Sequence, residues 1–158
     1  MSNKNLISPY GGKLVNLLVS GKEREELVDR MPNLPSIKIS MRAQCDLELL
    51  ATGGFSPLDR FMDKATYERV LHEMRMDGGE LWPLPITLTA NPDELPTVGK
   101  EIVLRSALND PLAIMRLEEV FSWNPEKEAR LAYGTDDARH PMVSEMVRTF
   151  RDRLEERI

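Results

Sequence analysis

The chain changes character near its midpoint, and this change most limits what it can fold into. Up to Gly79, apolar residues recur at helical spacing between residues that suit helix ends. Beyond Gly79, short runs of aliphatic residues are separated by turn residues such as Pro92, Pro96, Gly99 and Asn109-Asp110-Pro111. We therefore expect an α+β fold with a compact β core in the second half of the chain.

Five short helices are expected, each beginning beside a residue that suits a helix N-terminus. These residues are Ser20, Ser40, Ser56, Asp63 and Asn124. In the helix after Ser40, the spacing of Met41, Cys45 and Leu49 predicts an apolar, buried face. Strands are expected at residues 37–39, 86–89, 101–104 and 113–123.

The segment Gly53–Met62, with the sequence GGFSPLDRFM, is the most informative stretch of the chain. Its two glycines favour a turn, Ser56 suits an N-cap, and Pro57 suits the first position of a helix. Phe61 and Met62 then supply apolar anchors. Local chemistry alone therefore predicts that a helix begins at Ser56 on a packed surface.

The last residues form an amphipathic pattern that predicts a helix from Pro141 to Ile158. Acidic and basic side chains are balanced on its polar side, and its apolar stripe needs a surface on the same domain or on a partner. We divide the chain into a domain at residues 1–141 and a docking or oligomerisation helix at 142–158. The candidate interaction residues are Val143, Met146, Val147, Phe150, Leu154 and Ile158.

Composition excludes several classes of protein. Hydrophobic residues make up 41% and charged residues 30%, which is typical of a globular protein and not of a disordered one. The net charge of −5 is spread along the chain, so a nucleic-acid partner is not expected. No stretch approaches the ~20 apolar residues of a membrane span. A single cysteine and the absence of an apolar leader indicate a reducing cytoplasm.

The residues that could carry chemistry are better explained as structure. Cys45, His72 and His140 show no catalytic motif and no metal-ligand spacing. The three Gly-Gly pairs lack the spacing of phosphate-binding loops, so they are read as turns. Trp82 and Trp123 stand at the ends of elements, where we expect them to pack at the rim of the β core. We expect no catalytic, cofactor-binding or metal-binding residue in this chain.

Several segments, in order, resemble the N-terminal domain of the ATP sulfurylase (sulfate adenylyltransferase) family. They are residues 6–14, 53–62, 81–88, 99–105, 117–120 and 133–141. The resemblance implies a PUA-like pseudo-barrel of mixed strands with peripheral helices. It also implies a role in joining sulfate to ATP, which yields adenosine 5′-phosphosulfate and pyrophosphate.

In that family Mg-ATP binds to a catalytic domain that follows this one. The catalytic domain carries a Gln-x-Arg-Asn-Pro motif, a His-x-x-His motif and a Gly-Arg-Asp-His segment, none of which occurs here. The resemblance therefore implies a non-catalytic accessory domain. Its partner would be a fused or separate catalytic domain, or a second copy through the C-terminal helix. The alternative is a free-standing PUA-like module that binds RNA.

Overall fold

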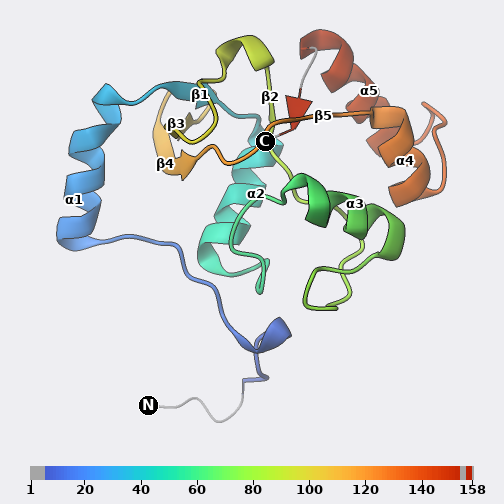
Figure 1. The fold of residues 1–158 in the computed structure, drawn as a ribbon, viewed down its shortest axis with the longest axis horizontal. Coiled ribbons are helices and arrows are strands. Elements are labelled where there is room, and N and C mark those ends of the chain that lie inside the picture. The colour runs from blue at the N-terminus through green and yellow to red at the C-terminus, as the bar shows by residue number, and fades with distance from the viewer. Residues whose placement is uncertain (1–5, 154–155, 158) are drawn as a thin grey trace.

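A computed structural model describes residues 6–153 and 156–157, and the ribbon in Figure 1 shows how its elements are arranged. The helices are α1 (Gly21–Arg30), α2 (Met41–Thr52), α3 (Lys64–Glu73), α4 (Pro125–Tyr133) and α5 (Pro141–Arg153). The strands are β1 (Ser36–Lys38), β2 (Thr89–Ala90), β3 (Glu101–Arg105), β4 (Pro111–Arg116), β5 (Phe121–Ser122) and β6 (Glu156–Arg157). Three single-turn 3₁₀ helices are η1 (Tyr10–Gly12), η2 (Met31–Asn33) and η3 (Pro92–Glu94).

The strands form two small sheets. In the first, β3 lies between β1, which runs parallel to it, and β4, which runs antiparallel. In the second, β6 lies between β2 and β5, and both pairings are antiparallel. Short mixed strands with helices around them confirm the expected α+β class.

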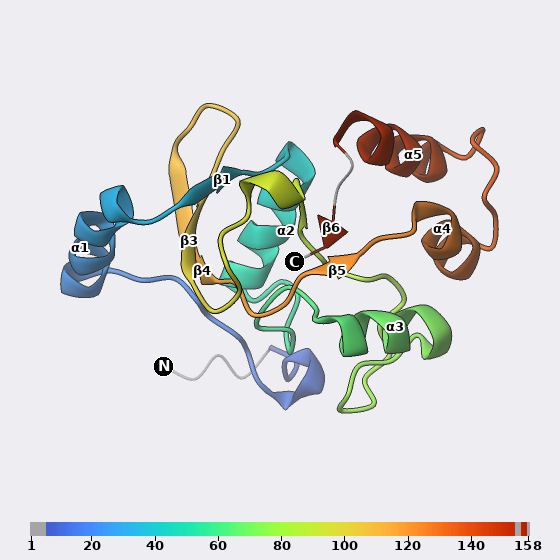
Figure 2. The same cartoon turned by 45° about the horizontal axis from the view of Figure 1, so that its top comes forward.

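The main core joins the first sheet to the central helices. Helix α2 lies between that sheet and α3, as the two views of Figures 1 and 2 agree. Because β3 places alternate side chains on opposite faces, Ile102 and Leu104 enter this core together. The most deeply buried side chains here include Leu50, Met62, Val70, Leu88, Ile102 and Leu104. Within the described residues, no helix has the length and apolar character needed to cross a bilayer.

The C-terminal helix packs on its own chain. Val143 and Met146 of α5 are buried with Trp123 and Ala129, and Val147 is partly buried against the same cluster. These three stripe residues therefore have α4 as a neighbour within the domain. Three other candidate residues cannot be placed: the side chain of Phe150 and the whole of Leu154 and Ile158 lie outside the described residues.

Local signals account for most helix ends. The side chains of Ser40, Asp63 and Asn124 each accept a backbone N–H bond from the residue three positions on, at 3.2, 2.8 and 2.9 Å. Gly53 and Gly134 end α2 and α4 in the left-handed conformation that glycine adopts without steric cost. Ser20 precedes α1 as expected but forms no side-chain cap.

The expected helix at Ser56 is wrong. Residues 53–57 form turns, and the N–H of Leu58 donates to the Phe55 carbonyl (2.8 Å) across a turn that contains the cis Ser56–Pro57 peptide. The Ser56 hydroxyl donates to the Gly53 carbonyl (2.7 Å) and accepts from the N–H of Val15 (2.9 Å). It is therefore committed to residues that precede it and does not cap a helix.

Four further expectations need correction. The helix expected from Pro141 to Ile158 ends at Arg153, and residues 156–157 form strand β6. Cys45 is exposed, because α2 buries the neighbouring stripe of Ala43 and Leu50, with Leu47 packed against the core. The predicted strand at 86–89 is reduced to β2, and the predicted strand at 113–123 is divided into β4 and β5. Residues 117–120 lie between β4 and β5 and belong to neither strand.

Candidate functional site

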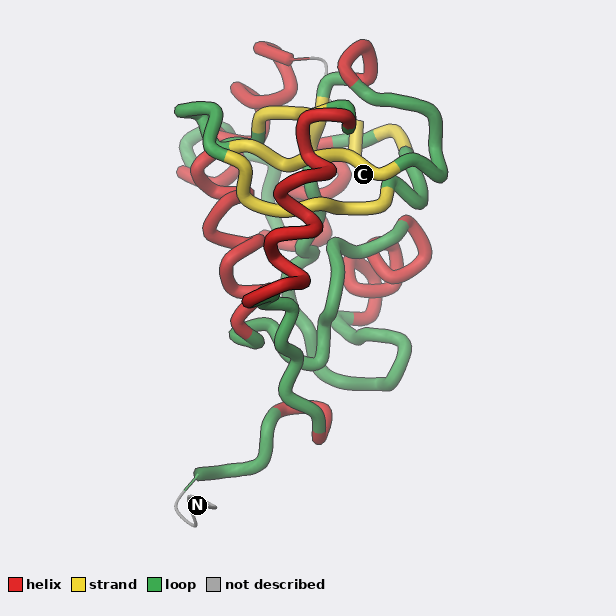
Figure 3. Tube along the Cα trace, turned by 90° about the vertical axis from the view of Figure 1, so that its left-hand side faces the viewer, coloured by secondary structure: helices red, strands yellow, loops and turns green. Residues whose placement is uncertain are grey.

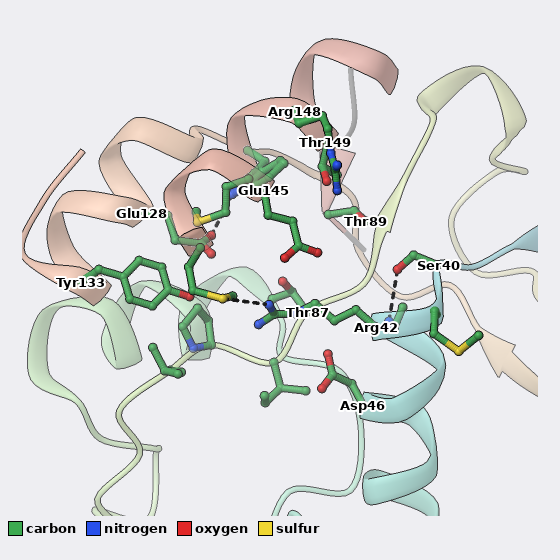
Figure 4. Close-up of a pocket in the computed structure, with 18 residues that line it drawn as sticks. Ser40, Arg42, Asp46, Thr87, Thr89, Glu128, Tyr133, Glu145, Arg148 and Thr149 are labelled. Carbon is green, nitrogen blue, oxygen red and sulfur yellow. Dashed lines mark hydrogen bonds between the residues drawn. The ribbon is translucent and has the colours of Figure 1, made fainter. Parts of the chain in front are cut away.

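A cleft of about 560 Å³ lies between the start of α2, the extended segment 84–89, and helices α4 and α5 (Figure 4). Its walls combine apolar side chains with polar ones from each of these elements. The polar lining residues are Ser40, Arg42, Asp46, Thr87, Thr89, Glu128, Tyr133, Glu145, Arg148 and Thr149. Segments distant in sequence therefore meet at this cleft.

The charges around the cleft are of both signs. Arg42, in the first turn of α2, extends across the cleft, and its Nη1 lies 3.8 Å from the sulfur of Met142 in α5. Asp46 from α2 and Glu145 from α5 also face this space (Figure 4). Opposite charges at close range reduce the net field, so the cleft does not present the uniformly positive surface that polyanions require.

Glu128 is a buried carboxylate at one side of the cleft. Its Oε2 accepts hydrogen bonds from the hydroxyl of Tyr67 (2.8 Å) and the indole N–H of Trp123 (2.7 Å). These bonds connect α4 with α3 and with the residue after β5. Because buried carboxylates require such donors, the arrangement explains Glu128 as a structural connection between elements.

Both tryptophans pack at element ends. Trp123 is buried, and its N–H meets a carboxylate. Trp82 lies edge-on to Phe55, with ring centroids 5.9 Å apart. Packing explains both residues.

The candidate thiol and imidazoles lie on three different elements. Cys45 is on α2, and His72 on α3 lies 3.5 Å from Glu68 at the surface. His140 precedes α5 and stacks on Tyr133, with ring centroids 5.3 Å apart. Across residues 6–153 and 156–157, no group of three or more side chains suited to a metal ion comes together.

Several carboxyl groups with a lowered pKa lie in ion pairs at the surface. The Lys127 ammonium, hydrogen-bonded at 2.7 Å, lowers the pKa of Glu68. Likewise the Arg60 guanidinium lowers the pKa of Asp59, and the Arg130 guanidinium lowers that of Asp136. Each shift has an adjacent cation as its main cause, which is a stabilising arrangement and not a proton-transfer site.

The sequence analysis did not predict that residues 11–15 pack closely against the segment at residues 53–62. A Cβ on Gly53 would lie far inside van der Waals contact of the Val15 carbonyl oxygen, and Gly53 has φ +84°. A Cβ on Gly11 would lie 2.6 Å from Cγ of Pro57. Glycine at both positions allows the two segments to approach closely, and the Ser56–Val15 hydrogen bond joins them.

Comparison with known proteins identifies the fold. A family described as a PUA-like domain matches residues 7–153. The chain is 39% identical over 144 residues to the sulfate adenylyltransferase of Symbiobacterium thermophilum, covering 90% of this chain and 37% of that protein. It is 41% identical over 138 residues to the sulfate adenylyltransferase of Staphylothermus marinus, covering 86% and 36%.

A solved structure agrees with these relatives. The hexameric APS kinase from Thiobacillus denitrificans superposes with a TM-score of 0.68 at 40% identity, covering 75% of this chain and 24% of that one. The chain thus spans little more than a third of the curated relatives it matches. It belongs to the PUA-like domain family and corresponds to the N-terminal domain of sulfate adenylyltransferases.

Proposed function

We propose that this chain is a non-catalytic accessory domain that supports sulfate activation. The observation that carries the proposal is the extent of the match: about nine-tenths of this chain aligns with about 37% of a sulfate adenylyltransferase. The family's catalytic motifs do not occur in the sequence. The chain would then supply a scaffold, and a catalytic region would bind Mg-ATP and sulfate.

The shared segments support a scaffold role. Residues 11–15 and 53–62 hold each other through close approaches at Gly11 and Gly53 and through the hydrogen bond from the Val15 N–H to the Ser56 hydroxyl. The catalytic partner would be fused to this chain or separate from it, in a cytoplasmic route of sulfate assimilation. A dimer through the C-terminal helix has less support, because Val143 and Met146 are buried against α4.

Pyrophosphate release from ATP in the presence of sulfate tests the proposal. The chain alone should release none above background. A fusion protein in which this chain replaces the matching region of the Symbiobacterium thermophilum relative should be active. Turnover by the chain alone would overturn the non-catalytic assignment, and an inactive fusion beside an active parent would overturn the supporting role. Salt-sensitive binding of RNA by the chain would favour the RNA-binding alternative instead.

A further inference from the structure

The N-terminal arm, residues 6–20, exposes an unusual amount of apolar surface. Seven large apolar side chains are exposed along it: Leu6, Ile7, Tyr10, Leu14, Leu17, Leu18 and Val19. Ile7 is 94% exposed and Leu18 is 63% exposed. Contiguous exposed apolar surface of this kind marks interaction sites in proteins that are soluble as monomers.

The arm is also poor in charge. Lys13 is the single charged residue between Leu6 and Ser20, whereas most residues of the following helix α1 are charged. Depletion of charge is the compositional mark of the centre of a protein interface. Gly21 therefore marks the boundary between an arm whose composition suits burial in an interface and a helix whose composition suits exposure to water.

Hydrogen bonds anchor the arm to the rest of the domain while these side chains face outward. The N–H groups of Val15 and Leu17 donate to the Ser56 hydroxyl and the Ala51 carbonyl, both at 2.9 Å. The Tyr10 hydroxyl donates to the Leu81 carbonyl at 3.1 Å. Val15 alone among the large apolar residues of the arm is buried. Figure 1 shows the arm, in blue, passing from η1 near the lower end of α2 to α1, and Figure 3 shows η1 projecting below the sheets.

An anchored arm with outward apolar side chains is pre-organised for docking, because less conformational entropy is lost on binding than for a free segment. We propose that the N-terminal arm docks the catalytic portion of a sulfate adenylyltransferase, fused or separate. This inference rests on the proposed function. Length supports this occupant: the family match begins at residue 7, so it includes the arm, and the relative carries nearly two-thirds of its chain outside the matched region.

The test uses the fusion of this chain to the remainder of the Symbiobacterium thermophilum relative. The arm variant is Leu14→Ser with Leu18→Ser. The matched control, Val98→Ser with Leu108→Ser, removes two apolar side chains that are 50% and 87% exposed away from the arm. In the isolated chain both variants should leave the unfolding midpoint nearly unchanged, because all four side chains face water.

In the fusion the two variants should differ. The arm variant should lower the unfolding midpoint by several degrees, and the control should not. Amide hydrogen exchange in the arm should be at least about tenfold slower in the fusion than in the isolated chain. Equal midpoints for the two fusion variants, or unchanged exchange in the arm, would overturn the docking surface while leaving an active fusion and the proposed function intact.

Two other outcomes would contradict the proposed function or the proposed occupant of the arm. An inactive wild-type fusion would overturn the proposed function, and the docking inference with it. A dimer of the isolated chain in sedimentation, converted to a monomer by the arm variant, would assign the arm to a second copy and overturn the catalytic occupant.

Discussion

Replacing Gly53 by alanine tests how closely the arm is held against the end of α2. Gly53 has φ +84°, and an added Cβ would overlap the Val15 carbonyl oxygen, which belongs to the backbone and cannot rotate away. The arm must therefore shift outward before the methyl group fits. That shift separates Val15 from the Ser56 hydroxyl and strains the neighbouring bond from Leu17 to Ala51.

The expected magnitude has two parts. An L-residue in the left-handed conformation costs about 1–2 kcal/mol. Two hydrogen bonds lost or weakened add about 1 kcal/mol each. We therefore expect Gly53→Ala to lower the free energy of unfolding by about 3–4 kcal/mol.

Gly134→Ala is the matched control. Gly134 also ends a helix in the left-handed conformation, with φ +71°, but an added Cβ would meet nothing within 4 Å. Gly134→Ala should therefore lower the free energy of unfolding only by the conformational part, about 1–2 kcal/mol. Urea unfolding followed by tryptophan fluorescence measures both variants, since Trp82 and Trp123 lie in different parts of the fold. Equal losses in Gly53→Ala and Gly134→Ala would refute the close approach of the arm.

Three further predictions concern the packing of the helices. Tyr67→Phe removes a hydrogen bond to the buried carboxylate of Glu128 and should lower the free energy of unfolding by about 1–3 kcal/mol in urea titrations. Val143→Ala opens a cavity between α5 and α4 and should lower it by about 2 kcal/mol in the same assay. Lys127→Met removes the main cause of the lowered pKa of Glu68, so an NMR titration should show that pKa rise toward its usual value. Because the folded pKa is the lower one, the pair stabilises the fold above the unfolded pKa and by less than about 1 kcal/mol, and this contribution disappears as the pH falls through the folded pKa.

Two of these predictions, Tyr67→Phe and Val143→Ala, have a control on a less buried group. Tyr10→Phe removes a hydroxyl bond at the surface and should be milder than Tyr67→Phe. Val147→Ala, at a partly buried position, should be milder than Val143→Ala. Reversal of either order would contradict the burial described for α4 and α5. A Glu68 pKa that stays low without Lys127 would show that another group lowers it.

The sequence predicted those parts of the fold that short-range chemistry decides. Ser40, Asp63 and Asn124 cap helices because the bond each one forms reaches only three residues. Gly134 ends α4 for an equally local reason.

Other features depend on partners that the local sequence does not reveal. Ser56 and Pro57 are equally suited to a helix start and to a tight turn, and the deciding contact is Val15, 41 residues away. Cys45 and Ala43 lie on different faces of α2, and only the surrounding core selects the face that is buried.

The same limit applies to the candidate sites. The stripe of α5 was predicted from spacing, but its neighbour, α4, became apparent only in the fold. The run from Leu14 to Val19 has the composition of a core segment, yet most of its side chains face water. Sequence gives the apolar character of such a run, while its exposure depends on which backbone groups anchor it.

The most direct test of the scaffold assignment is sulfate-dependent pyrophosphate release by three samples at equal concentration. These are the isolated chain, the fusion to the remainder of the Symbiobacterium thermophilum relative, and that relative itself. The account predicts release by the fusion and by the relative, and none by the isolated chain. Release by the isolated chain, or an inactive fusion beside an active relative, would contradict it.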